Sequence, residues 1–312
     1  MPLATSPAAA LGLGAGLAVD AVLADPRRGH PVAAFGTFAA RAERLLHRDS
    51  RPAGVLYAGS LVGATALLGT GLSRASRTPA RRFAVTAIAT WAVVGGTTLR
   101  REARTMRRLL AADELDGARR RLSHLCGRDP AALDADGLAR ATVESVAENT
   151  SDAVVAPLFW GAVAGVPGLL GYRAVNTLDA MVGHRSERYL RFGWAAARLD
   201  DAANLAPARV TAGLATLLAP VVGGRRSVAW RAWRRDGGKH PSPNAGPVEA
   251  AFAGALGRTL GGTLAYSGRT EHRPLLGDGP APTVDDIARA ARLSGAVTLA
   301  AGVLAVAVRA AR

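Results

Sequence analysis

Three acidic side chains recur at one-turn spacing between residues 144 and 152. Glu144, Glu148 and Asp152 stand at positions i, i+4 and i+8, so a helix would place them on one face. Three carboxylates on one face repel one another unless a cation offsets their charge. The spacing therefore indicates either a site for magnesium or a metal-bound phosphate, or an acidic helix end that nearby arginines neutralise.

A second polar segment runs from Asn176 to Arg209 between two apolar runs. Its candidate site residues are Asn176, Asp179, Arg185, Arg188, Arg198, Asp200, Asp201 and Asn204. Asp200 and Asn204 are one helical turn apart, as are Arg198 and Asp201. Polar groups next to a membrane are costly and by default indicate a functional site. The alternative is a solvated amphipathic helix with salt bridges such as Glu187 to Arg191.

The third polar segment is a loop at residues 236–246, which reads DGGKHPSPNAG. Its glycines let backbone N–H groups approach an anion, and Lys239 and His240 add positive charge. Lys239 is the single lysine of a chain in which arginine fills every other basic position. An ammonium is not equivalent to a guanidinium at a phosphate. The spacing is not that of a Walker loop, and an ordinary turn remains the alternative.

Long apolar runs separate these polar segments. A helix needs ~20 apolar residues to cross a membrane, with a range that begins near ~17. The run at 52–73 meets this length, and the run at 83–99 is next. The runs at 1–19 and 293–308 are predicted to span with the help of their flanks. A shorter run at 210–224 contains Pro220 and is predicted to be re-entrant.

The apolar run at 153–172 is predicted to be a broken helix. It carries Pro157, Pro167 and four glycines. Proline inside a helix frees backbone groups that lipid cannot satisfy, so such a segment has to pack inside the protein. A broken or half-inserted helix would let the polar segments on its two sides share one face of the membrane.

Composition supports a membrane protein. Apolar residues make up 49% of the chain, only 5% are aromatic, and there are 36 glycines, which suits closely packed membrane helices. The net charge of +15 lies between apolar runs, which favours a membrane surface over nucleic acid, and no nucleic-acid-binding signature is visible. The single cysteine, Cys126, excludes an internal disulfide and a cysteine-based zinc site.

Arginine counts predict the orientation. Segment 25–52 has six arginines and segment 100–152 has ten, so both are expected in the cytoplasm, although loop 73–82 also has four. The N-terminus lacks a positive n-region, and we expect a retained first span rather than a removed signal peptide.

The predicted fold class is all-α. We expect a polytopic membrane helix bundle, a single domain over residues 1–312, with polar motif-bearing loops. Residues 100–150 read as a soluble helical insert, with helices expected near 102–110, 116–125 and 134–149. No period-2 strand pattern is apparent anywhere in the chain.

Together these segments resemble one family, the adenosylcobinamide-phosphate synthases of cobalamin biosynthesis. The resemblance opens with Asp25-Pro26 and His30-Pro31 and is strongest in ESVAENTSDAVVAPLF at 144–159. It continues through residues 172–211, KHPSPNAG at 239–246, EAAFAGALG at 249–257 and a late Gly277-Asp278. Ala153 stands where the family usually has glycine, and Pro247 where it often has tryptophan.

The resemblance implies an integral enzyme of the cytoplasmic membrane with a cytoplasmic active site. It implies ATP-dependent amide formation between adenosylcobyric acid and (R)-1-aminopropan-2-ol or its phosphate, with Mg²⁺ and ATP required. Within that mechanism the expected catalytic residues are Glu144, Lys239 and His240, with Glu144 or His240 as the base. The expected metal ligands are Glu148 and Asp152, or alternatively Asp200 and Asp201. The expected substrate- or phosphate-binding residues are Asn149, Asn176, Asp179, Arg185, Arg188, Arg198, Asn204, Ser242 and Asn244.

The competing hypothesis is a corrinoid-binding or corrinoid-transporting membrane protein without catalysis. A broken helix at 153–172 and the polar midsection would then line a path. A transporter would favour paired halves with inverted repeats, and no repeat is apparent. Lys239 in a glycine-rich loop favours nucleotide chemistry instead. A third class, a structural membrane scaffold, has no need for so many acids and asparagines.

Overall fold

The computed structural model describes residues 7–26, 29–126, 130–131, 133–266 and 269–312. Helices account for most of these residues, which confirms the predicted all-α membrane fold class. The chain separates into two compact units that interleave along the sequence. Unit 1 comprises Met1–Gly95, Ala156–Asn204 and Ala301–Arg312, and unit 2 comprises Gly96–Val155 and Leu205–Ala300. The predicted insert at 100–150 thus packs in one unit with residues 205–300, which lie much later in the sequence.

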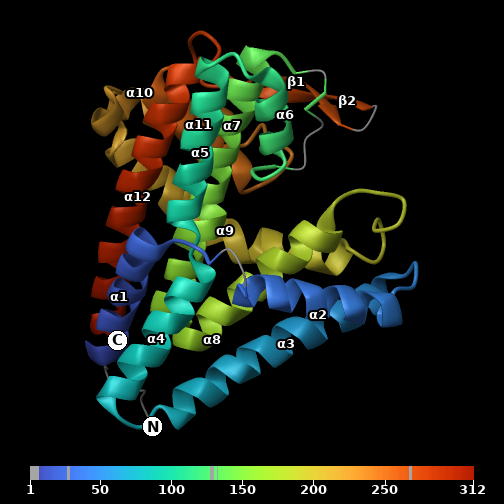
Figure 1. Cartoon of the computed structure of the whole chain (residues 1–312), viewed down its shortest axis with the longest axis vertical. Helices are drawn as coiled ribbons and strands as arrows, with labels where there is room; N and C mark the ends of the chain where they lie inside the picture. Colours follow the sequence, from blue (N-terminus) through green and yellow to red (C-terminus); the bar gives the residue numbers. More distant parts are fainter. Residues whose placement is uncertain (1–6, 27–28, 127–129, 132, 267–268) are drawn as a thin grey trace. The chain divides into compact units, whose positions relative to one another are not determined.

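Unit 1 contains the helices that several of the apolar runs predict, together with α2 (Pro31–Leu46), the π-helix η2 (Asp179–Gly183) and the first half of α9 (Trp194–Leu217), which no apolar run predicts. Its other elements are α1 (Pro7–Leu23), α3 (Arg51–Ala75), α4 (Pro79–Val93), α8 (Ala156–Leu178) and the end of α12 (Val284–Ala310). Helix α1 packs along α4, and α3 packs along α8 (Figure 1). A hydrophobic core of this unit contains buried aromatic rings. The ring centroids of Tyr57 and Phe192 lie 5.0 Å apart, and the Tyr57 hydroxyl donates a hydrogen bond to the Ala39 carbonyl at 3.2 Å.

Four helical stretches are long and apolar enough to cross a membrane. They are Arg51–Ala75, Pro79–Ala111, Ala135–Gly183 and Val284–Ala310, and Pro7–Leu23 is a shorter apolar helix. These stretches contain the runs predicted as spans at 52–73, 83–99 and 293–308, and also the run at 153–172 that was predicted to be a broken helix. Exposed leucines on α3, such as Leu67 and Leu68, are the surface that lipid would solvate.

The predicted break in the 153–172 run lies at Gly165. This residue has φ +67° and ψ −147°, a backbone conformation open essentially to glycine alone, and it divides α8 into two helical pieces. Pro167 follows two residues later, at the first turn of the second piece, where its missing N–H would have no helical partner anyway. The break is therefore encoded by a glycine and a proline acting together.

Unit 2 contains the remaining helices and one hairpin. Its elements are α5 (Gly96–Ala111), α6 (Leu115–Leu122), α7 (Ala135–Thr150), the π-helix η1 (Ser151–Val155), the second half of α9, the 3-10 helix η3 (Ala219–Val222), α10 (Arg226–Asp236), α11 (Ala245–Leu256), β1 (Leu260–Tyr266), β2 (Arg269–Leu276) and most of α12. Asp134 caps α7 by accepting the Gly137 N–H at 2.8 Å, so the expected start of this helix is confirmed. The expected re-entrant stretch at 210–224 is the end of α9 followed by η3.

The expectation of no strand is wrong at residues 260–276. There β1 and β2 form an antiparallel hairpin with Leu260 paired to Leu276 and an irregularity between Leu260 and Gly262. The alternation of apolar and polar residues that predicts a strand is absent here, because two glycines interrupt β1 and charged residues fill β2. No apolar face is therefore visible in the sequence. Contacts with α7 and α11 supply the support that a lone hairpin lacks.

Candidate functional site

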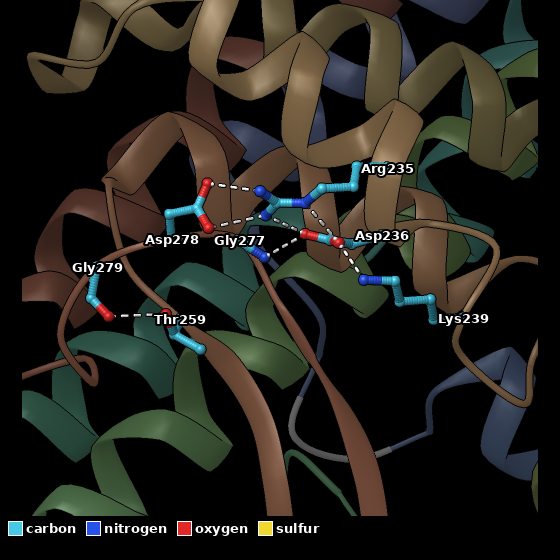
Figure 2. A network of polar contacts seen from close by, with 7 residues as sticks. All are labelled: Arg235, Asp236, Lys239, Thr259, Gly277, Asp278 and Gly279. Atoms are coloured by element: carbon cyan, nitrogen blue, oxygen red, sulfur yellow. Dashed lines mark hydrogen bonds and ion pairs between the residues drawn. The ribbon is translucent and has the colours of Figure 1, made fainter.

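The lysine loop of unit 2 is organised around one buried carboxylate. Asp236, the last residue of α10, has only 1% of its surface exposed. Its two oxygens accept hydrogen bonds from Arg235 at 2.7 and 2.8 Å, from Lys239 Nζ at 2.8 Å and from the Gly277 N–H at 2.8 Å (Figure 2). The ammonium of the only lysine is therefore held at a defined point.

The same group joins the lysine loop to the segment that follows the hairpin. Arg235 forms a two-pronged ion pair with Asp278, with both N···O distances at 2.9 Å (Figure 2). Beside it, Thr259 donates to the Gly279 carbonyl at 2.7 Å. Arg235, Asp236, Lys239, Gly277 and Asp278 together are called the Asp236 cluster below. The late Gly277-Asp278 motif thus contacts the lysine loop, from which it is separated by about forty residues of chain.

Electrostatics fix the charge state of the cluster. The hydrogen bonds from Arg235, and then those from Lys239 and Gly277, hold the pKa of Asp236 far below its usual range even though burial opposes the charge. The pKa of Arg235 is raised by its hydrogen bonds to Asp236 and Asp278. Asp236 is therefore an ionised carboxylate at neutral pH. The Lys239 side chain keeps about half of its surface exposed, so its remaining N–H groups are available to an anion.

The rest of the lysine loop is held by its own polar side chains. His240 Nδ1 accepts the Ser242 N–H at 3.0 Å, and Ser242 Oγ accepts the N–H groups of Asn244 and Ala245 at the start of α11. Asn244 Oδ1 accepts from Arg209 Nη1 at 3.0 Å. The predicted residues Lys239, His240, Ser242 and Asn244 therefore form one ordered loop.

The acidic motif at 144–152 does not present one straight face. Glu144 is buried, and its Oε1 accepts the Gly261 N–H of β1 at 2.8 Å, whereas Glu148 is exposed. Asn149 donates to the Ser145 carbonyl at 2.9 Å. The α-helix ends at Thr150, and Asp152 lies in the π-helix η1, whose wider turn ends the i, i+4 spacing.

Among the residues that the structure describes, no group of three or more His, Cys, Asp and Glu side chains is arranged to hold a metal ion. The assignments of Glu148, Asp152, Asp200 and Asp201 as metal ligands stay predictions. Magnesium commonly takes one or two protein carboxylates together with substrate phosphates, so a single well-placed carboxylate is enough to anchor it.

Unit 1 contains such a carboxylate at Asp200. Asn204, with 1% of its surface exposed, donates to Asp200 Oδ2 at 2.9 Å and accepts from the Tyr172 hydroxyl at 2.9 Å. Asn176 Nδ2 lies 3.5 Å from Asp200 Oδ1. The predicted one-turn pairing of Asp200 with Asn204 is confirmed, and Asn176 joins it from α8. Amide donors on both oxygens orient this carboxylate.

The other predicted residues of unit 1 have separate surroundings. Arg198 pairs with Asp201 at 3.2 Å, as their spacing predicts. Arg188 is bound to Glu43 of α2 at 2.9 Å, and the Tyr189 hydroxyl donates to the same carboxylate at 2.8 Å, so this guanidinium braces α2. Arg185 is exposed.

Two further features of the segment from Asn176 to Arg209 involve acidic residues, one a steric limit and the other an ion pair. A side chain at Gly183 would overlap Asp179, since an added Cβ would lie 1.9 Å from its Oδ1. The salt bridge expected between Glu187 and Arg191 is replaced by one from Arg191 to Asp49 at 3.9 Å.

Sequence reasoning gave no role to Arg235, Asp236 or Asp278. Arg235-Asp236 reads as an ordinary charged helix end, and only the i, i+3 spacing from Asp236 to Lys239 hints at a pair. Tyr172 and Glu43 were missed because each partner is distant in the sequence.

Comparison with known proteins decides the family. A sequence profile described as CobD/Cbib protein matches residues 13–294. The chain belongs to the CobD/CbiB family. It is similar to the cobalamin biosynthesis protein CobD of Mycobacterium tuberculosis H37Rv, at 57% identity over 95% of both chains. It is also similar to CobD of Chromobacterium violaceum, at 44% identity over 95% of this chain and 97% of that one. No solved structure matches the chain.

Membership of the CobD/CbiB family gives the chain a role in cobalamin biosynthesis, and its four apolar helical stretches make it a membrane protein. A role in that pathway points to corrinoid substrates. The Asp236 cluster and the Asp200 network both lie within the matched residues 13–294. The resemblance expected from the sequence is confirmed at the level of the family.

Proposed function

We propose that the chain is an adenosylcobinamide-phosphate synthase, which joins (R)-1-aminopropan-2-ol or its phosphate to a propionate carboxylate of adenosylcobyric acid at the expense of ATP. Its family membership supports the pathway. The observation that carries the chemistry is the Asp236 cluster, since a buried carboxylate fixes a half-exposed ammonium in a loop of glycine and proline. Such a group suits a phosphate in transfer.

A carboxylate needs activation before an amine will attack it. In the proposed reaction, the corrinoid carboxylate oxygen bonds to the γ-phosphorus of ATP, the bond to ADP breaks, and an acyl phosphate forms. The amine nitrogen then bonds to the acyl carbon, phosphate leaves, and one proton passes from nitrogen to a base. Magnesium would neutralise phosphate charge. Lys239 is the group we assign to the transferred phosphoryl oxygens. Among the carboxylates predicted to bind metal, Asp200 is the one that two amides orient, and we propose it as a metal ligand.

The hydrogen bonds also discriminate between the two predicted bases. His240 Nδ1 accepts the Ser242 N–H, so this ring nitrogen is already engaged within the loop. Glu144 Oε1 accepts the Gly261 N–H, and a carboxylate has about four lone-pair sites over its two oxygens. Glu144 is therefore the base we favour. We further propose that the enzyme lies in the cytoplasmic membrane with this chemistry on the cytoplasmic side.

The test uses membranes from cells that express the chain, supplied with adenosylcobyric acid, ATP, Mg²⁺ and either form of the amine. Cobinamide or its phosphate is followed by mass spectrometry. Lys239→Ala is expected to lower turnover by roughly 100-fold or more, and Lys239→Arg to restore little of it. Arg231→Ala removes an exposed charge from the same helix, α10, and serves as the matched control.

Each outcome has a definite meaning. ATP-dependent product that disappears in Lys239→Ala and persists in Arg231→Ala would support both the reaction and the site. Product that persists in Lys239→Ala would keep the reaction and discard Lys239. Absence of product with either amine, together with tight corrinoid binding, would favour the transport hypothesis, for which the break in α8 would offer a path.

A further inference from the structure

Unit 1 contains a cavity that the proposed reaction does not use. Its volume is about 630 Å³, within the range of small-molecule sites. Residues of α1, the end of α3, the start of α4, the break in α8 and the end of α12 line it. Four of the lining residues are arginines, namely Arg74, Arg77, Arg82 and Arg309.

The charge around this cavity is of one sign. No aspartate or glutamate lines it, and in the described part of the chain none of the four arginines forms an ion pair with a carboxylate. Arg82 Nε donates to the Ser76 carbonyl at 3.0 Å, which holds its guanidinium at the cavity. Four like charges around one space repel one another, and a bound anion would offset that repulsion.

The broken helix adds a second attraction for an anion. A Cβ atom at Gly165 would lie 3.2 Å from Arg309 Nη2, so this guanidinium lies over the break. The second piece of α8 begins at the cavity wall with Val166 and Pro167. The first N–H groups of a helix lack internal partners and favour negative charge. The arginines carry the argument, and the helix start acts in the same direction.

The remaining wall of the cavity combines apolar residues with the hydroxyl groups of serines and threonines. Ala9, Val85 and Val163 contribute to it. On α3, Leu67 precedes Thr70 by three residues and Arg74 by seven, so it shares their face, and 72% of its surface is exposed. The apolar run of α3 ends at Ser73, directly before Arg74, which is where a spanning helix meets the phosphate groups of the bilayer.

We propose that this cavity binds the phosphate group of an anionic ligand, and that an anionic phospholipid is the ligand favoured by the exposed apolar face of α3 beside Arg74. The phosphate would contact Arg74, Arg77, Arg82 and Arg309, and an acyl chain would follow the Leu67 face of α3. The proposal is independent of the amide-forming reaction. It also accounts for three of the four arginines of loop 73–82, namely Arg74, Arg77 and Arg82, which fit poorly with an external loop of few positive charges.

The test uses the full chain purified in detergent. Its probes are phosphatidylglycerol, phosphatidylcholine and inorganic phosphate, and binding is read by native mass spectrometry and by the shift in melting temperature. The triple variant Arg74→Gln, Arg77→Gln, Arg309→Gln removes charge from the cavity. The control Arg44→Gln, Arg48→Gln, Arg81→Gln removes three exposed arginines of unit 1 that do not line it, one of them from the same loop.

The expected result is a preference of the wild type for phosphatidylglycerol, which weakens by roughly tenfold or more in the cavity variant and changes little in the control. Phosphate binding that is lost only in the cavity variant, with both lipids bound alike, would support the site and identify a free phosphate as its ligand. Equal losses in both variants would overturn the proposal. If the cavity variant fails to fold, a wild type that prefers neither phosphatidylglycerol nor phosphate overturns it by itself.

Discussion

At the scale of single residues, Asp236 is the group on which the lysine loop depends. It is buried, ionised and bound by donors from a helix end, a loop and the segment after the hairpin. Arg235 and Lys239, by contrast, each expose about half of their side chains. Asp236 therefore acts through Lys239 as a positioning residue, and its removal should affect geometry and stability together.

Asp236→Asn tests this role. The amide keeps one acceptor but loses the charge, and we expect a loss of about 1–3 kcal/mol in stability and a lower kcat with little change in KM. Because the pKa of Asp236 is lowered in the folded state, its contribution is present above the unfolded value near ~3.9 and is lost only as pH falls through the lower folded pKa. The melting difference between variant and wild type should thus stay flat from about pH 5 to 8. A difference that shrinks across that range would contradict the assignment.

Asp200 and Asp201 were both predicted to bind metal, and their contacts now separate them. Asp200 is oriented by Asn176 and Asn204, whereas Asp201 is paired with Arg198. We expect Asp200→Asn to raise the Mg²⁺ concentration for half-maximal activity by roughly tenfold or more, and Asp201→Asn to raise it by much less. A magnesium titration of both variants measures this. Equal shifts, or a larger shift for Asp201→Asn, would reject the assignment to Asp200.

At the scale of elements, run length and turn chemistry predicted much of the fold. A helix that crosses a bilayer needs a minimum length of apolar residues, so long apolar runs predict long helices. The four membrane-length helical stretches accordingly contain the apolar runs at 52–73, 83–99, 153–172 and 293–308. The hairpin at 260–276 was missed because its support comes from α7 and α11, which no local pattern shows. Asp236 was missed for the same reason, since burial depends on tertiary contacts.

Glu144 links α7 to the hairpin, and its two possible roles respond differently to substitution. Glu144→Gln keeps an acceptor for the Gly261 N–H and should preserve the hairpin, while activity falls if Glu144 is the base. Glu144→Ala leaves the buried N–H without this acceptor and should cost about 1–3 kcal/mol. Hydrogen exchange at residue 261 and turnover, measured on both variants, separate the roles. Full activity in Glu144→Gln would exclude Glu144 as the base.

The break in α8 depends on Gly165. Gly165→Ala forces a side chain into a backbone conformation that only glycine adopts readily, and its Cβ would also approach Arg309, so we expect a loss of about 1–3 kcal/mol. Gly171→Ala is the matched control in the same helix, where the nearest atom to an added Cβ is the Ala66 Cβ at 3.6 Å. That change should be neutral or slightly stabilising. Melting in detergent measures both, and an equal effect would mean that α8 tolerates a continuous helix.

At the scale of the whole molecule, the arginine distribution and the proposed requirement for ATP make one joint prediction about which side of the membrane each segment faces. Segment 100–152 is expected in the cytoplasm and loop 73–82 outside. The excess of arginine in that loop runs against the rule that positive loops are cytoplasmic. The proposed anion cavity explains the position of three of these arginines, Arg74, Arg77 and Arg82. The predicted orientation then depends on segments 25–52 and 100–152, whose arginine counts both indicate the cytoplasmic side.

Cys126, the single cysteine, is a native reporter for this orientation, because it lies in segment 100–152 and is partly exposed. In intact cells, a membrane-impermeant maleimide should leave Cys126 unlabelled and label it after permeabilisation. Thr78→Cys in a Cys126→Ser background should be labelled in intact cells, because Thr78 is exposed in the α3–α4 loop. The reverse pattern would put segment 100–152 outside. ATP is supplied from the cytoplasm, so ATP-dependent turnover would then require the Asp236 cluster to lie on the opposite side of the membrane from segment 100–152, within the same unit of the fold. Reversed labelling would therefore reject the predicted orientation, and with it the placement of segment 100–152 and the Asp236 cluster together on the cytoplasmic side.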